Sequence, residues 1–204
     1  MGIKENIITG AFKLFMRRGI KSVSMDDIAL ELGISKKTIY KWFENKDEIV
    51  EAALTAFLND MNRDCCQFPN DALNAIEELF RVMGMIRQKL AGVHASVFFD
   101  LQKYHPKAYL LWIHHKNEVI YQSIVQNLQR GINEKLYRDD LNIEIMAQLR
   151  LLQTEHGFNP EFFNPDVFDL QKVQLAIQEH YMLGIATLKG HKLINEYKQV
   201  TEVE

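Results

Sequence analysis

The sequence has few of the residues that mark fibrous, disulfide-bonded or membrane-spanning proteins. Its 204 residues include only 4 prolines and 2 cysteines, and it contains no run of about 18 apolar residues that could cross a bilayer. Because Cys65 and Cys66 are neighbours, they cannot easily bond to each other, so we expect free thiols and a cytoplasmic location. With 47% hydrophobic and 25% charged residues, the composition excludes a disordered or collagen-like chain.

Motifs of common catalytic and metal-binding sites are also missing. The sequence contains no G-x-S-x-G, no P-loop, no G-x-G-x-x-G and no H-E-x-x-H. His114 and His115 would point about 100° apart on a helix, so both cannot reach one ion without partners elsewhere. We therefore expect a protein that is not an enzyme and that has no metal site and no cofactor.

The net charge of −3 is unevenly distributed along the chain. Residues 1–50 carry nine Lys or Arg and seven Asp or Glu, a net of +2, so residues 51–204 carry −5. Between residues 36 and 46, four lysines accompany one glutamate. A mildly acidic protein does not coat nucleic acid nonspecifically, but this local cluster is compatible with a small basic contact surface.

Apolar residues recur at helical spacing almost everywhere, and no segment alternates in the manner of a strand. The chain is therefore predicted to be all-α. Phe68-Pro69-Asn70 breaks the pattern after one long helix and marks a boundary to the helices that follow, and residues 158–169, with two Asn-Pro pairs, form a loop. The first predicted helix ends before Gly19. The others cover about residues 25–32, 36–43, 46–67, 71–91, 93–103, 106–134, 143–156 and, as the last helix, 170–189.

Residues 24–43 have the pattern of a helix-turn-helix. Ser24 precedes a short helix and Asp27 follows three residues later, a capping-box arrangement. Gly33 can adopt a positive φ that permits a sharp turn, and Ser35 is placed to cap the next helix. In such a motif the second helix lies in the major groove of DNA. Any helical hairpin can contain a glycine turn, however, so these features alone leave a purely structural role open.

Side chains that can contact phosphates or base edges are concentrated on the second helix of this motif. Lys37 and Thr38 lie in its N-terminal half, the part that reaches bases. Lys46 begins the following helix, where free N–H groups and the positive end of the dipole favour a phosphate. The predicted DNA-binding set is Ser24, Lys36, Lys37, Thr38, Tyr40, Lys41, Trp42 and Lys46.

The run from Ser22 to Val50 resembles the DNA-binding domain of TetR-type transcriptional regulators, and the resemblance covers about residues 5–55. It implies that Tyr40 and Lys46 contact phosphates and that Thr38 lies against the groove. Lys37 stands where the family often has Gly, and Leu32 where Ala is common, so the operator cannot be transferred from a relative. The residues in family register are Ile28-Ala29, Gly33-Ile34-Ser35, Thr38-Ile39-Tyr40, Phe43 and Lys46-Asp47.

The resemblance also implies two domains. A three-helix helix-turn-helix domain occupies residues 1–50, and the helix from about 46 joins it to a larger helical bundle in residues 51–204. In the family, this bundle holds a small-molecule effector, and its last two long helices form a homodimer. The predicted effector pocket is Phe80, Met83, Phe98, Trp112 and Tyr121, which would equally suit an ordinary core. The predicted dimer contacts are Ile177, Tyr181, Gly184 and Leu188, on a final helix that could instead be wholly internal.

Taken together, these features predict a homodimeric, sequence-specific regulator of transcription that binds double-stranded operator DNA. A repressor released by a small-molecule effector is the leading interpretation. One alternative is a helical-bundle enzyme or small-molecule carrier in which the helix-turn-helix only packs. The other is a DNA-binding activator that needs no ligand.

Overall fold

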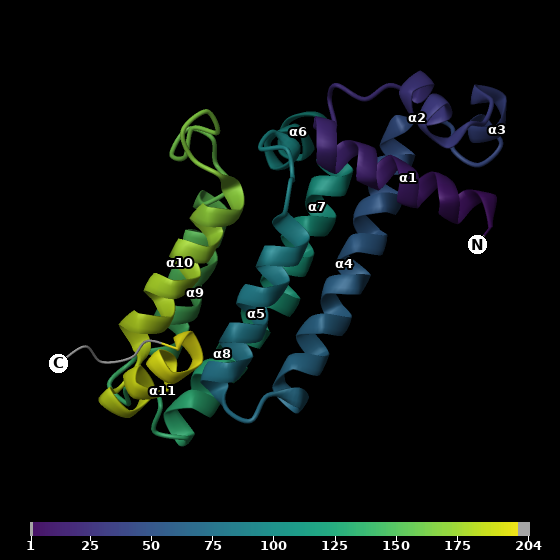
Figure 1. The fold of residues 1–204 in the computed structure, drawn as a ribbon. Coiled ribbons are helices and arrows are strands. Elements are labelled where there is room, and N and C mark those ends of the chain that lie inside the picture. The colour runs from purple at the N-terminus through teal and green to yellow at the C-terminus, as the bar shows by residue number, and fades with distance from the viewer. Residues whose placement is uncertain (1, 200–204) are drawn as a thin grey trace.

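The part of the chain that the structure describes is built from helices. The computed structural model describes residues 2–199, and no β-strand occurs among them, as the sequence predicts (Figure 1). None of the helices in this range is long and apolar enough to cross a membrane. In chain order the elements are α1 (Ile3–Arg18), α2 (Met25–Leu32), α3 (Lys36–Tyr40), α4 (Lys46–Asp71), α5 (Ala75–Leu90), α6 (Val97–Tyr104), α7 (Pro106–His115), the π-helix η1 (Lys116–Ile120), α8 (Tyr121–Asn133), α9 (Ile143–His156), α10 (Leu170–Ile185) and α11 (Leu188–Lys198).

Helices α1, α2 and α3 form a small head at one end of the molecule (Figure 1). Ile28 of α2 and Ile39 of α3 are fully buried and belong to one hydrophobic cluster. The turn between these helices has Gly33 at φ 64° and ψ 29°, a left-handed conformation that favours glycine. Ser24 and Ser35 each accept a hydrogen bond from a backbone N–H in the first turn of the helix that follows. The predicted helix-turn-helix is therefore confirmed.

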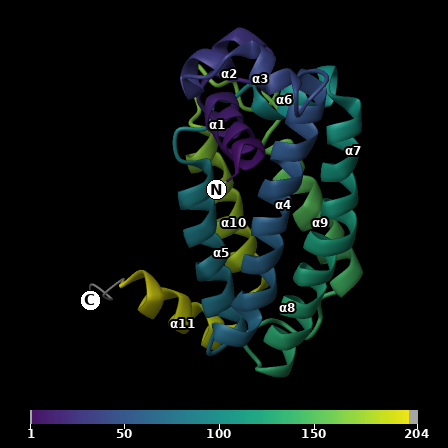
Figure 2. The ribbon, with the colours of Figure 1, turned by 90° about the vertical axis from the view of Figure 1, so that its right-hand side faces the viewer.

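The long helix α4 connects the head to the rest of the molecule. It begins beside the head and continues to the opposite end of the bundle (Figures 1 and 2). The predicted break at Phe68-Pro69-Asn70 is wrong, because α4 includes Pro69 and ends at Asp71. Proline removes one backbone donor from a helix. Here it stands in the last turn, where the Asn70 Nδ2 donates to the Cys66 carbonyl at 3.0 Å.

The helix predicted over residues 106–134 is present as the continuous run α7, η1 and α8. Pro106 is its first residue, where a missing N–H costs nothing. Residues Lys116–Ile120 adopt the wider π-helical winding within this run. The sequence pattern does not distinguish that winding from an α-helix.

The predicted last helix, 170–189, is wrong at its end, because α10 stops at Ile185 and a further helix, α11, follows. Ala186 is extended and forms an isolated antiparallel bridge with Tyr137. Thr187 then caps α11 by accepting a hydrogen bond from Gly190 N. Helix α11 extends from the end of the bundle opposite α2 and α3 (Figures 1 and 2).

Two buried hydrophobic clusters hold the described residues together. The first joins Ile39 and Val50 of the head region to Val97, Leu101 and Trp112 of α6 and α7. The second lies at the other end and combines residues of α5, α8, α9, α10 and α11. The boundary predicted between residues 50 and 51 falls inside the first cluster, so the head shares its core with the bundle.

Alanine should have opposite effects on the free energy of unfolding at Gly33, in the left-handed turn, and at Gly84, inside a helix. Gly33→Ala should lower the free energy of unfolding by about 1–2 kcal/mol, because a Cβ disfavours positive φ. Gly84→Ala, in the middle of α5, should raise it by about 0.5–1 kcal/mol through helix propensity. A Cβ at either position meets no atom within 4 Å, so clashes do not obscure the comparison. Urea unfolding measures both; equal effects of the two substitutions would contradict the described turn.

Candidate functional site

The exposed side of α3 carries large and basic side chains on a fixed backbone. Ile39 anchors the helix from beneath, and the Ser35 Oγ accepts from the Thr38 N–H at 3.1 Å. Tyr40 and Trp42 are 50% and 48% exposed, so both rings are accessible for contact. We call this area the α3 surface; it consists of Lys36, Lys37, Thr38, Tyr40, Lys41 and Trp42.

The basic side chains of the α3 surface differ in their partners. The Lys36 Nζ lies 2.9 Å from the Asp26 carboxylate, so part of its charge is already balanced. Lys37 and Lys41 are exposed and form no ion pair within residues 2–199. Ser24 is exposed at the start of α2, where it exchanges hydrogen bonds with Asp27. The free positive charge of this surface therefore comes from Lys37 and Lys41.

Lys46 does not extend toward the α3 surface as expected for a side chain that contacts phosphate. Its Nζ donates hydrogen bonds of 2.9 Å to the carbonyl oxygens of Ile20 and Val23, in the loop between α1 and α2. Burial lowers the pKa of the Lys46 ammonium, an effect that the carboxylates of Asp47 and Asp100 oppose. The predicted phosphate contact through this ammonium is corrected accordingly: the side chain stabilises the head.

Helix α6 ties the head to the bundle through polar contacts. The Asp100 Oδ2 accepts from the Lys21 N–H at 2.9 Å and from the Ser96 Oγ at 3.0 Å. At the other end of α6, the His105 Nδ1 lies 2.7 Å from the Asp47 Oδ1 at the start of α4. The carboxyl of Asp100 is buried, so its contact with the head is shielded from water.

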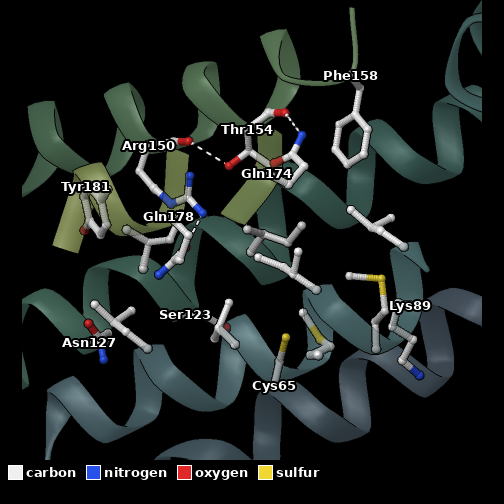
Figure 3. A pocket seen from close by; sticks show the side chains of 18 of the residues that line it. Cys65, Lys89, Ser123, Asn127, Arg150, Thr154, Phe158, Gln174, Gln178 and Tyr181 are labelled. Carbon is white, nitrogen blue, oxygen red and sulfur yellow. Dashed lines mark hydrogen bonds between the residues drawn. The ribbon is translucent and has the colours of Figure 1, made fainter. Parts of the chain in front are cut away.

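The bundle contains a cavity of about 160 Å³, surrounded by α4–α10 (Figure 3). Of the predicted pocket residues, Phe98 and Trp112 line it. Phe80, Met83 and Tyr121 do not line it; they pack in the second hydrophobic cluster. Phe80, for example, contacts Tyr197 of α11 with ring centroids 5.1 Å apart. Because the sequence pattern does not separate α11 from α10, this face of α5 is expected to line the pocket, whereas in the structure it packs against α11.

Polar side chains line the cavity from several helices: Ser123 and Asn127 from α8, Lys89 from α5, and Arg150, Thr154, Gln174 and Gln178 from α9 and α10 (Figure 3). Arg150 is only 6% exposed, and its Nη2 donates to the Gln178 Oε1. Within residues 2–199 no partner is found for the Arg150 Nη1, the Gln178 Nε2 or the Tyr181 hydroxyl. Sequence reasoning missed Arg150; the one available signal is its helical register with the buried Ala147 and Leu151, a position normally taken by an apolar residue.

The predicted dimer residues do not share one surface. Tyr181 faces the cavity and Ile177 is half-buried, whereas Gly184 is exposed on α10. Leu188 is exposed as the first residue of α11. The broader apolar face lies on α9, where Ile145, Leu149 and Leu152 are 64%, 43% and 42% exposed.

No group of three or more His, Cys, Asp or Glu side chains able to hold a metal ion occurs within residues 2–199.

Comparisons with known proteins agree with this geometry. Residues 7–53 match the family of bacterial regulatory proteins, tetR family. A HTH-type transcriptional regulator of Bacillus subtilis, YvaF, is 31% identical over 109 residues, which is 52% of this chain and 56% of that protein. The HTH-type transcriptional repressor KstR2 of Mycobacterium tuberculosis is 24% identical over 139 residues, or 67% of this chain and 70% of the repressor.

The same fold is found in a solved structure. A TetR-family transcriptional regulator from Agrobacterium tumefaciens superposes with a TM-score of 0.73 at 16% identity, covering 90% of this chain and 97% of that one. At this level of identity, the likeness concerns the fold.

The contacts of Lys46 predict a loss of stability when its charge is removed. Lys46→Met leaves two carbonyl oxygens without their donor and should lower the free energy of unfolding by about 1–3 kcal/mol. Lys37→Met removes the same charge from an exposed position and should change it by less than about 0.5 kcal/mol. Urea unfolding of both variants tests this; similar values for the two would contradict the inward position of Lys46.

Proposed function

We propose that this chain is a homodimeric repressor that binds operator DNA and is released by a small molecule; the premise is the match of residues 7–53 to the TetR family of bacterial regulatory proteins. The observation that carries the proposal is the α3 surface. It presents lysine, threonine and aromatic side chains on a helix that the buried Ile39 fixes in place. Such groups read base edges and contact phosphates in the major groove.

Two heads are needed because one five-residue helix reads few bases. In helix-turn-helix dimers, recognition helices enter grooves about 34–36 Å apart, so the protein must join two chains at that spacing. The exposed faces of α9 and α10 support a two-fold contact. Ile145, Leu149 and Leu152 of α9 are exposed apolar side chains, and Gly184 on α10 would allow the helices of two copies to approach closely.

The effector acts through α6 in this proposal. Phe98 of α6 lines the cavity, and two residues later Asp100 accepts the hydrogen bond from the head. A ligand that displaces Phe98 therefore moves the same helix that positions α1 and α2. It shifts the population away from the DNA-binding arrangement by the difference between its affinities for the two states.

DNA binding is tested by selection of duplexes from a random pool, followed by titration of the selected duplex at several salt concentrations. We expect a palindromic site and a contact by Lys41 to phosphate. Lys41→Ala should then weaken binding and flatten the slope of log K against log salt by about one unit. Thr38→Ala should change the preferred base at its own position in each half-site.

The matched control is Lys192→Ala, which removes an exposed lysine from α11 at the far end of the molecule. It should leave both affinity and slope as in the wild type. Selection of no sequence, or equal behaviour of the Lys41 and Lys192 variants, would contradict the assignment of the α3 surface.

The dimer face predicts different effects of leucine at two exposed helical glycines. Gly184→Leu should convert the dimer to a monomer at micromolar concentration, because the added side chain keeps the two copies of α10 apart. Gly84→Leu on α5 should leave the dimer intact. A Cβ at either glycine meets no atom within 4 Å, so both variants should fold. Light scattering gives the molar mass of the wild type and of both variants. A monomeric wild type, or a dimer that Gly184→Leu leaves intact, would contradict this interface.

A further inference from the structure

The cavity contains a buried positive charge without a counter-ion. No carboxylate pairs with Arg150 within residues 2–199, and its one hydrogen bond inside the cavity goes to the neutral amide of Gln178. Its guanidinium carbon also lies 5.4 Å from the centre of the Tyr181 ring. A cation–π contact of this kind offsets only part of the cost of removing a cation from water.

The acidic side chain that lines the cavity, Glu78, and the acidic side chain on the helix of Arg150, Glu155, both have other partners. Glu78 lies 3.4 Å from the Arg130 Nη1, and burial raises the pKa of the Glu78 carboxyl. Glu155, on the same helix as Arg150, pairs with Lys116 at 2.7 Å. Neither carboxylate balances Arg150. Burial lowers the pKa of the Arg150 guanidinium to about 10, so the group stays charged at neutral pH.

Three donors without partners lie at the same side of the cavity. They are the Arg150 Nη1, the Gln178 Nε2 and the Tyr181 hydroxyl, and all three side chains are more than nine-tenths buried. Gln178 and Tyr181 are one turn apart on α10, and Arg150 approaches them from α9 (Figure 3). Burial raises the pKa of the Tyr181 phenol, which therefore keeps its proton as a donor. Unsatisfied buried donors of this kind call for an acceptor.

Aromatic side chains line another part of the cavity. Phe98 and Phe158 stack there with ring centroids 3.7 Å apart, and Trp112 packs edge-on against Phe98. The cavity volume of about 160 Å³ is close to the roughly 150 Å³ of an engineered cavity that holds benzene. The space therefore suits an apolar group about the size of a phenyl ring or a short acyl chain.

We propose that this cavity binds a compact organic carboxylate, with its carboxylate on Arg150, Gln178 and Tyr181 and its apolar body against Phe98, Trp112 and Phe158. A carboxylate carries one negative charge and accepts two parallel bonds from a guanidinium. A phosphate dianion would leave one charge unbalanced beside Arg150, because Lys89, which also lines the cavity, is already paired with Asp60 and Asp64. The identification of the carboxylate as the effector rests on the proposed function, whereas its binding does not.

The test uses the full-length protein without DNA and a panel of benzoate, phenylacetate, 3-phenylpropionate, hexanoate and octanoate. Each carboxylate is compared with its own primary amide, which has the same body but no charge. At a hundredfold excess over its Kd, the best carboxylate should raise Tm by about 5–10 °C. Its amide should produce a much smaller rise. An amide that stabilises equally, or a panel without effect, overturns the proposal.

Arg150→Met keeps the volume and removes the charge, and it should abolish the response to the carboxylate. Because an unpaired buried cation is lost, the variant should fold at least as well as the wild type. Arg87→Met removes an exposed guanidinium outside the cavity and should respond as the wild type does. An Arg150→Met protein that still responds would overturn the proposal; if it fails to fold, the carboxylate and amide comparison on the wild type decides alone.

The two proposals fail separately. Absence of a specific duplex in the DNA selection contradicts the regulator but leaves the Tm comparison untouched. A protein that binds a specific duplex and is stabilised equally by amide and carboxylate is a regulator with a different ligand.

Discussion

The hydrogen bond from the Lys21 N–H to the Asp100 carboxylate is the contact on which the coupling between head and bundle depends. Asp100 is buried, so this contact is shielded from water. Asp100 lies on α6, the short helix that also contributes Phe98 to the cavity wall. Around it, Val97 and Leu101 belong to the same hydrophobic cluster as the core of the head. Because packed cores deform poorly, the head cannot turn unless α6 and the start of α4 move with it. In the proposed mechanism, a ligand in the bundle acts on the head through α6.

Two cations withdrawn from solvent to different degrees, the half-buried Lys46 and the buried Arg150, differ in how the chain satisfies them. Lys46 has two carbonyl acceptors at 2.9 Å, so its charge is satisfied within the chain and stabilises the loop between α1 and α2. Arg150 has one amide acceptor and no carboxylate within the described residues. A cation whose hydrogen bonds are satisfied within the chain needs no further partner, whereas a buried cation without a counter-ion lowers the stability of the fold by several kcal/mol until an anion binds it. We therefore assign Lys46 to the fold and Arg150 to a ligand.

Local signals account for what could be predicted from the sequence. Ser24, Gly33 and Ser35 determine the helix-turn-helix through interactions within a few residues, and Asn142 and Pro106 begin their helices for the same reason. The errors arise where distant contacts decide. Pro69 is tolerated because it stands in the last turn of α4, and α10 ends at Ile185 because Ala186 pairs with Tyr137. The cavity lining follows from which helix faces which neighbour, so Phe80 was assigned to the pocket when its partner is Tyr197.

The central claim is that occupation of the cavity and binding of DNA are coupled through α6. The most direct measurement is the affinity of the protein for its selected duplex, with and without a saturating amount of the carboxylate that raises Tm most. The account predicts that the carboxylate weakens DNA binding by about 5–150-fold, and that the duplex weakens carboxylate binding by the same factor. An unchanged affinity for the duplex at saturating carboxylate would contradict it.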